Sequence, residues 1–169
     1  MLYSVARDPG NRSKVAVYSE KANVDPIGAC IGEKGSRIAR IIEELHGEKL
    51  DVVRYDKDPA IFIENALSQA KDLTVAITDP KKQEAMVIAD GDNFSLAIGK
   101  KGQNARLAAK LTSWKIDIKS ESQFREMLKQ LQEDNSEAIE DSDNSEVTKS
   151  DTVIEEQENQ VVQKTTEET

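Results

Sequence analysis

The five-residue stretch Ile31-Gly32-Glu33-Lys34-Gly35 recurs 67 residues later as Ile98-Gly99-Lys100-Lys101-Gly102. Each copy lies between a short apolar segment and a longer segment whose apolar residues recur at helical spacing. Glycine tolerates a positive φ, so a G-x-x-G sequence allows a sharp turn between two helices. One such motif arises often by chance, but two in the same context predict a duplicated α+β unit. Two ordinary helix–helix turns that bind no ligand are the alternative interpretation.

The segments around the two motifs predict the same order of elements in both halves of the chain. In the first half these are strands at 3–6 and 14–18, helices at 26–31 and 36–46, and a strand at 50–53. In the second half they are strands at 73–77 and 85–89, helices at 93–98 and 103–111, and a strand at 114–118. An additional helix at 58–70 precedes the second half, whereas the first half begins directly with a strand. We therefore expect the first unit to lack its leading helix and the chain to be a fragment of a longer protein.

The last 37 residues, from Glu133 onward, differ in composition from the rest of the chain. They carry 13 acidic residues and two lysines, and every glycine, proline and aromatic residue lies before them. Such a segment has little to bury and its charges repel one another, so we expect residues 133–169 to form a disordered acidic tail. The net charge of −9 therefore comes from the tail, and the residues before it are slightly basic.

The turn between the two helices is suited to a phosphodiester backbone. The helix after each motif directs its first N–H groups and the positive end of its dipole at the loop. Lysines add charge, but Glu33 lies beside Lys34 in the first loop, so we expect the second loop to attract phosphate more strongly. The candidate RNA-binding residues are those of the two loops and those that directly follow them: Ile31, Gly32, Glu33, Lys34, Gly35, Ser36, Arg37, Ile98, Gly99, Lys100, Lys101, Gly102, Gln103, Asn104 and Arg106.

Helix, G-x-x-G loop and helix is the arrangement of KH domains, whose loop clamps about four nucleotides of a single strand. Residues 4–18 and 23–37 resemble the first KH unit of the NusA family of bacterial transcription termination/antitermination factors, and residues 94–108 and 114–118 resemble its second unit. The resemblance covers about residues 2–122 and implies an α+β fold of two tandem prokaryotic-type (type II) KH domains. We expect these domains at 1–56 and 57–122, followed by a terminal helix at 123–132 and the acidic tail at 133–169.

The resemblance also implies a function and partners. It implies binding of single-stranded RNA, the nascent transcript, and a role in pausing, termination and antitermination. In the family a polymerase-binding domain and an OB-fold domain precede the KH pair, and neither is encoded here. Contact with the RNA polymerase elongation complex is therefore implied for the full-length family rather than for this chain. Two other functions stay open: an RNA-binding accessory of an RNA-processing or ribosome-associated complex, and a protein-interaction module.

The composition argues against an enzyme. A single cysteine, Cys30, and a single histidine, His46, provide neither a multi-cysteine metal site nor a nucleophile–base pair with a third member. We expect Cys30 to be buried as a small apolar residue, and we expect no cofactor and no metal. No apolar run approaches the roughly 20 residues of a membrane-spanning helix. We expect a cytoplasmic monomer that makes no contact with membranes.

Overall fold

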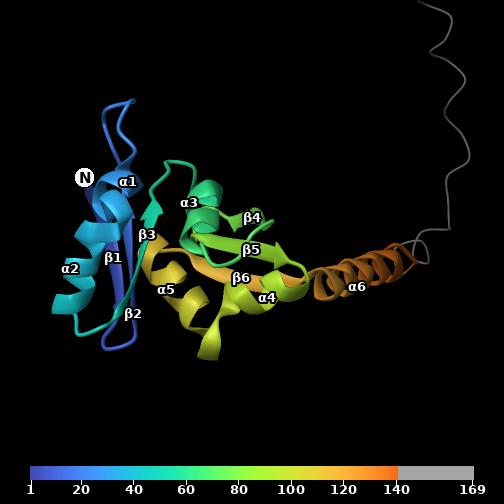
Figure 1. The fold of residues 1–169 in the computed structure, drawn as a ribbon. Helices are drawn as coiled ribbons and strands as arrows, with labels where there is room; N and C mark the ends of the chain where they lie inside the picture. The colour runs from blue at the N-terminus through green and yellow to red at the C-terminus, as the bar shows by residue number, and fades with distance from the viewer. Residues whose placement is uncertain (141–169) are drawn as a thin grey trace, which may run out of the picture. The chain divides into compact units, whose positions relative to one another are not determined.

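The computed structural model describes residues 1–140, and it confirms the predicted α+β fold with two three-stranded sheets. In the first sheet β1 (Leu2–Asp8) pairs antiparallel with β2 (Arg12–Val17), and β2 pairs parallel with β3 (Lys49–Arg54). In the second sheet β4 (Thr74–Asp79), β5 (Glu84–Ala89) and β6 (Lys115–Ser120) repeat this order and these directions. The duplication seen in the sequence is therefore a duplication of topology (Figure 1).

Helices make the crossover that a parallel strand pair requires. In the first unit α1 (Pro26–Ile31), the short 3-10 helix η1 (Glu33–Gly35) and α2 (Ser36–Glu44) connect β2 to β3. In the second unit α4 (Gly91–Ile98), η2 (Lys100–Gly102) and α5 (Gln103–Thr112) connect β5 to β6. The predicted G-x-x-G turns lie where each 3-10 helix joins the two longer helices.

The predicted helix starts are explained by local capping. The Asp25 carboxylate accepts hydrogen bonds from the backbone N–H groups of Ile27 and Gly28, and Pro26 occupies the first helical position. At the start of α3 (Pro59–Ala66), the leading helix of the second unit, the Asp58 carboxylate accepts a hydrogen bond from the Ala60 N–H and Pro59 occupies the first helical position. This helix ends at Ala66, four residues earlier than predicted, because the chain turns at Leu67.

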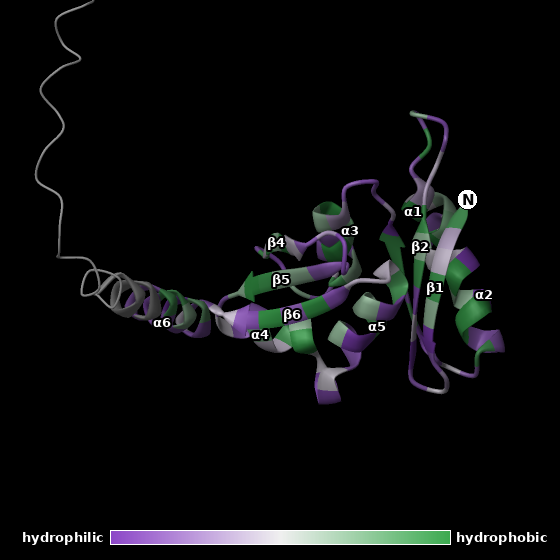
Figure 2. Ribbon diagram, turned by 180° about the vertical axis from the view of Figure 1, so that it is seen from behind, coloured by the Kyte–Doolittle hydropathy of each residue, from purple (hydrophilic) through white to green (hydrophobic). Residues whose placement is uncertain are grey.

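The two units share one hydrophobic core. It contains Ile63 and Leu67 from the α3 region and Leu107 from α5, and the first sheet contributes the small residues Ala6 and Ala16. Helix α5 packs against β1 and β2, so it lies between the two sheets (Figure 1). The central strand β5 is coloured mostly as hydrophobic in Figure 2, and its buried residues alternate with half-buried ones, so one of its faces points into the core. The shared core fixes the second loop relative to the first unit.

The other face of the first sheet is only partly covered. Leu2, Val5 and Ile41 are exposed and line an apolar hollow of about 440 Å³ between the sheet and helices α1 and α2. In the second unit the corresponding face is covered by α3, which packs on β4 and α5. The expected burial of Cys30 is wrong, because Cys30 lines this open hollow and is exposed.

The terminal helix is longer than predicted. Helix α6 runs from Glu121 to Glu140, so it includes residues 133–140, which the sequence assigned to the tail. Glu, Gln, Leu and Met are strong helix formers, and an Arg125–Glu121 pair at 2.9 Å supports the first turns. The remainder of the predicted tail, 141–169, lies outside the described residues. None of the described helices is both long and apolar enough to cross a bilayer.

Candidate nucleic-acid interface

The two G-x-x-G loops have the same backbone conformation. Gly32 and Gly99 have φ/ψ of 77°/173° and 74°/172°. The third residues, Lys34 and Lys101, are left-handed with φ of 51° and 54°. The last glycine of each loop is left-handed too, and its N–H donates to the first glycine's carbonyl at 3.1 Å in both loops. The two duplicated units therefore share the same uncommon backbone path.

The first glycine of the second loop is required for two reasons. Its φ/ψ falls in a region that is populated almost only by glycine. In addition, a Cβ at Gly99 would lie 2.8 Å from Asn104 Cβ and 2.9 Å from the Asn104 backbone nitrogen. At Gly32 the neighbour of such a Cβ is the side chain of Arg37, at 2.7 Å from its Cγ, which can move more easily than backbone.

Replacement of these glycines gives the first prediction. We expect Gly99→Ala to lower the free energy of unfolding by about 2–4 kcal/mol, from backbone strain and from the contact with Asn104. Gly102→Ala is the matched control, since Gly102 also has a positive φ but nothing lies within 4 Å of the added Cβ. We expect it to cost about 1 kcal/mol. Urea denaturation measures both, and equal losses would contradict the crowding at Gly99.

Three candidate residues brace the loops. Asn104 is 2% exposed, and its Nδ2 donates to the carbonyls of Leu96 and Ala97 at 3.1 Å each. Arg106 donates to the carbonyl of Lys101 at 2.9 Å, and Arg37 donates to that of Ala29 at 2.6 Å in the first unit. Their direct contact with RNA stays a prediction, and their bracing of the loop was not evident from the sequence.

The loop lysines are available to a ligand. Lys34, Lys100 and Lys101 are exposed, and within the described part of the chain none of their ammonium groups has an ion-pair partner. The first loop also exposes Glu33, whereas the second carries two adjacent lysines. The greater positive charge of the second loop is a property of the folded chain as well as of the sequence.

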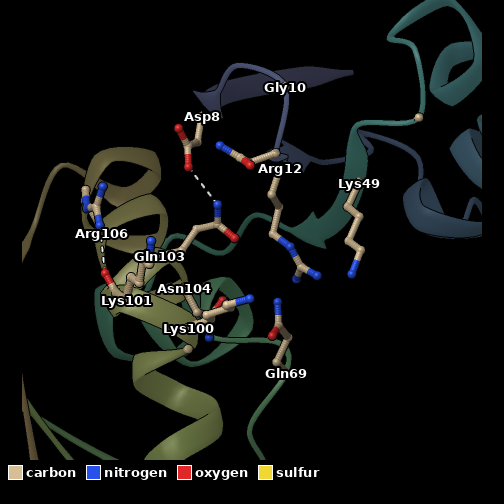
Figure 3. Close-up of a pocket in the computed structure, with 13 residues that line it drawn as sticks. Asp8, Gly10, Arg12, Lys49, Gln69, Lys100, Lys101, Gln103, Asn104 and Arg106 are labelled. Atoms are coloured by element: carbon tan, nitrogen blue, oxygen red, sulfur yellow. Dashed lines mark hydrogen bonds between the residues drawn. The ribbon is translucent and has the colours of Figure 1, made fainter.

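The second loop forms one side of a polar hollow of about 600 Å³, shown in Figure 3. Lys100, Lys101 and Arg106 line it on this side, and the first loop does not contribute. The opposite side comes from Arg12 and Lys49 of the first sheet, together with other residues of the β1–β2 turn and Gln69. Lys49 and Gln69 were not predicted from the sequence, because they belong to no motif and only the tertiary fold brings them to the second loop.

A buried carboxylate holds the β1–β2 turn in place. Glu48 is 1% exposed and accepts hydrogen bonds from Arg7 Nε at 3.0 Å, from the Gly10 N–H at 2.9 Å and from the Ser13 hydroxyl. The hydrogen bonds from Arg7 and then Ser13 are the main causes that lower the pKa of Glu48 to about 2. Glu48 thereby positions Gly10, which lines the hollow.

This carboxylate gives a prediction about acid stability. Because its pKa falls from 4.5 to about 2 on folding, ionised Glu48 stabilises the protein at neutral pH, and this contribution is lost as the pH decreases from about 4.5 to about 2. We expect Glu48→Gln to have a lower free energy of unfolding than the parent at neutral pH. This difference should narrow as the pH decreases through the same window. Urea denaturation at several pH values measures it, with the exposed Glu43→Gln as control. A difference that stayed constant with pH would show that Glu48 is not held as the anion.

Two sheets, each with a helix–G-x-x-G–helix crossover between its parallel strands, define a pair of tandem KH domains. A family model described as NusA-like first KH domain matches residues 1–55, and one described as NusA-like second KH domain matches residues 59–126. The chain belongs to the NusA family and contains its tandem KH region.

Three relatives show the extent of the similarity. The chain is 54% identical over 126 residues to the transcription termination/antitermination protein NusA of Halalkalibacterium halodurans, which covers 75% of this chain and 33% of that protein. It is 52% identical over 126 residues to the NusA of Bacillus subtilis, covering 75% and 34%. It is 48% identical over 141 residues to that of Thermus thermophilus, covering 82% and 36%. The chain thus spans about a third of the length of the curated relatives it matches.

Proposed function

We propose that this chain binds single-stranded RNA through the loops Gly32–Gly35 and Gly99–Gly102 and so contributes to transcription pausing, termination and antitermination. The observation that carries the proposal is the repeated loop geometry, in which a path restricted to glycine presents exposed lysines without ion-pair partners among the described residues. A KH loop with this composition approaches about four nucleotides through their backbone, which glycines allow and lysines favour.

The preference for a single strand has a separate argument. Near the start of α1, a hollow of about 400 Å³ is lined by Ile27 and by Val52 and Val53 of the edge strand β3. Asn65 and Ser68 of the second unit contribute polar groups, and the hollow is also lined by charged residues of both signs: Arg54, Glu64, Lys71 and Asp72. Apolar surface next to amide and hydroxyl groups accommodates unpaired bases, whose faces stack and whose edges form hydrogen bonds. In a duplex the base faces stack on one another and the Watson–Crick edges are paired, so neither is available to this hollow.

The proposed partner is the nascent transcript, which places the protein in the cytoplasm and requires no self-association. The relatives named above are termination/antitermination proteins, and this chain spans only the KH third of their length. We assign contact with the RNA polymerase elongation complex to the full-length proteins, and RNA contact to the region described here.

Filter binding at low salt tests the proposal. The probes are a random-sequence single-stranded RNA pool of about ten nucleotides, long enough for two loops, and a duplex of the same length. We expect the single strands to bind and the duplex to bind much more weakly. No binding of either probe would overturn the proposal and favour the protein-interaction module. Equal or tighter binding of the duplex would contradict recognition of unpaired bases.

A further inference from the structure

The hollow of about 600 Å³ beside the second loop has two sides that come from different units. Among its lining residues Arg12, Lys49, Lys100, Lys101 and Arg106 are cationic, and Asp8 is the one acidic residue. The Asp8 carboxylate already accepts a hydrogen bond from Gln103 Nε2 at 2.7 Å, visible in Figure 3. The charge that faces the hollow is therefore strongly positive and suited to an anion.

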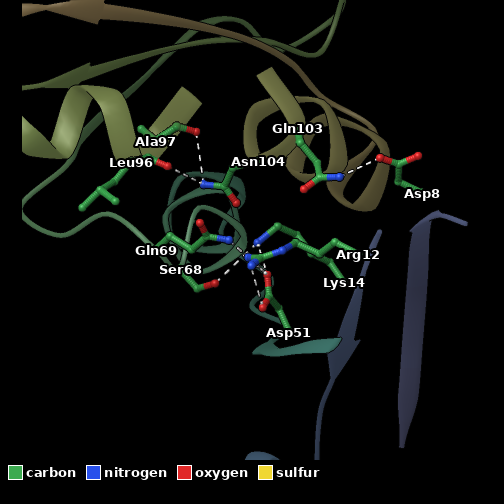
Figure 4. A network of polar contacts seen from close by, with 10 residues as sticks. All are labelled: Asp8, Arg12, Lys14, Asp51, Ser68, Gln69, Leu96, Ala97, Gln103 and Asn104. Atoms are coloured by element: carbon green, nitrogen blue, oxygen red, sulfur yellow. Dashed lines mark hydrogen bonds and ion pairs between the residues drawn. The ribbon is translucent and has the colours of Figure 1, made fainter. Parts of the chain in front are cut away.

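An ion-pair cluster anchors Arg12, one of the cations that line the hollow. The Asp51 carboxylate forms ion pairs with two cations, Lys14 Nζ at 3.0 Å and Arg12 Nη1 at 3.1 Å (Figure 4). The Lys14 side chain is fully buried, and its burial lowers its pKa despite the opposing effect of Asp51. Arg12 is itself only slightly exposed, at 16% of its side chain. Arg12 is already one of the lining cations, and the charges of Lys14 and Asp51 cancel, so the cluster holds the Arg12 guanidinium at the hollow without adding net charge.

The two sides are held at a fixed distance. The Gln103–Asp8 hydrogen bond connects the helix after the second loop to the turn of the first unit. The hydroxyl of Ser4 on β1 also donates to the carbonyl of Leu111 on α5 at 3.0 Å. The hydrophobic core shared by the two units joins them further. A hollow with such rigid sides is preorganised, and its volume falls within the range of about 300–1,000 Å³ found for small-ligand pockets.

We propose that this hollow, which we call the junction site, holds the phosphate and sugar of one nucleotide of an RNA strand that passes between the second loop and the first unit. Lys49 and Arg12 contact the phosphate from the first unit, and Lys100 contacts it from the second. The inference rests on the proposed function, since the strand is the one that the loops bind. It adds a contact made by residues outside both G-x-x-G motifs.

Lys49→Ala tests the junction site. Lys49 is exposed, its backbone pairs with β2 and donates to the Asn11 carbonyl at 3.1 Å, and its ammonium group has no ion-pair partner among the described residues. The matched control is Lys82→Ala, an exposed lysine of the β4–β5 turn that does not line the hollow. Affinity for the single-stranded RNA pool is measured across a range of salt concentrations, and thermal unfolding checks that both variants are folded. Lys49→Gln repeats the test with a longer neutral side chain.

We expect Lys49→Ala and Lys49→Gln to lower the affinity about 5- to 10-fold at low salt and to reduce the slope of log affinity against log salt by about 0.7, the value of one phosphate contact on a single strand. Lys82→Ala should leave both unchanged. If the Lys49 variants bind like the parent while loop variants lose binding, the junction site is wrong and the proposed function stands. If Lys49→Ala and Lys82→Ala lower the affinity equally, the effect of Lys49 is only that of its charge at a distance, and the junction site is again wrong. If the parent itself binds no RNA, the proposed function fails and the junction site with it.

Discussion

Lys100→Asp combined with Lys101→Asp is expected to weaken binding of single-stranded RNA by at least about 100-fold at low salt, because two phosphate contacts are lost and two repulsive charges take their place. Both side chains are exposed and, in the described region, unpaired, so the fold does not depend on them. Lys101 has a φ of 54°, a conformation that aspartate tolerates better than most residues. Filter binding measures the loss.

The chain offers a close control for this variant. Lys81 and Lys82 are also adjacent exposed lysines, but they lie in the β4–β5 turn. Lys81→Asp with Lys82→Asp makes the same change in net charge away from the loop, and we expect it to cost no more than a few-fold, about the effect of general electrostatics. If the loop variant is folded and binds as tightly as the parent, the second loop is not the RNA site.

A strand long enough for both loops is expected to bind about 10²- to 10⁴-fold more tightly than one that fits a single loop. The physical reason is the shared core. Because α5 packs against β1 and β2, the second loop is held at a set place relative to the first unit, and binding at one loop brings the RNA to the other at high effective concentration.

Isothermal titration with RNAs of about four and about ten nucleotides measures this gain. The control protein is the Lys100→Asp, Lys101→Asp variant, for which the longer RNA should lose most of its advantage. A longer RNA has more binding registers, but these account for only a few-fold. Equal affinities of the two RNAs for the parent protein would show that the loops act independently or that one of them binds nothing.

The repeated unit could be predicted from the sequence because its determinants are local. Asp25-Pro26 and Asp58-Pro59 combine an N-cap with a first-turn proline, and both start helices in the structure. The two G-x-x-G motifs were likewise recognisable because glycine is needed for their backbone path, although the residues that brace the loops were not. The length of α6 was underestimated, because the prediction ended the helix where the acidic composition begins, at Glu133.

The packing of the two units could not be predicted, since it depends on residues far apart in the chain. Ala6, Ala16 and Val53 are buried by α3 and α5, but small residues on alternating positions do not identify what covers them. The same limit applies to the site. The loops were located, whereas Lys49 and Gln69 reach the second loop only through this packing. Cys30 was assigned to a core that the first unit leaves open.

Backbone amide chemical-shift mapping with single-stranded RNA tests the central claim most directly, because it observes both loops in the parent protein at once. We predict that the largest shifts on titration occur in Gly32–Gly35 and Gly99–Gly102 and in the first turn of the helix that follows each loop, and that both loops saturate together. Shifts that are confined to other surfaces, such as the apolar hollow beside Val5 and Ile41, while both loops remain unchanged, would contradict RNA binding through the G-x-x-G loops.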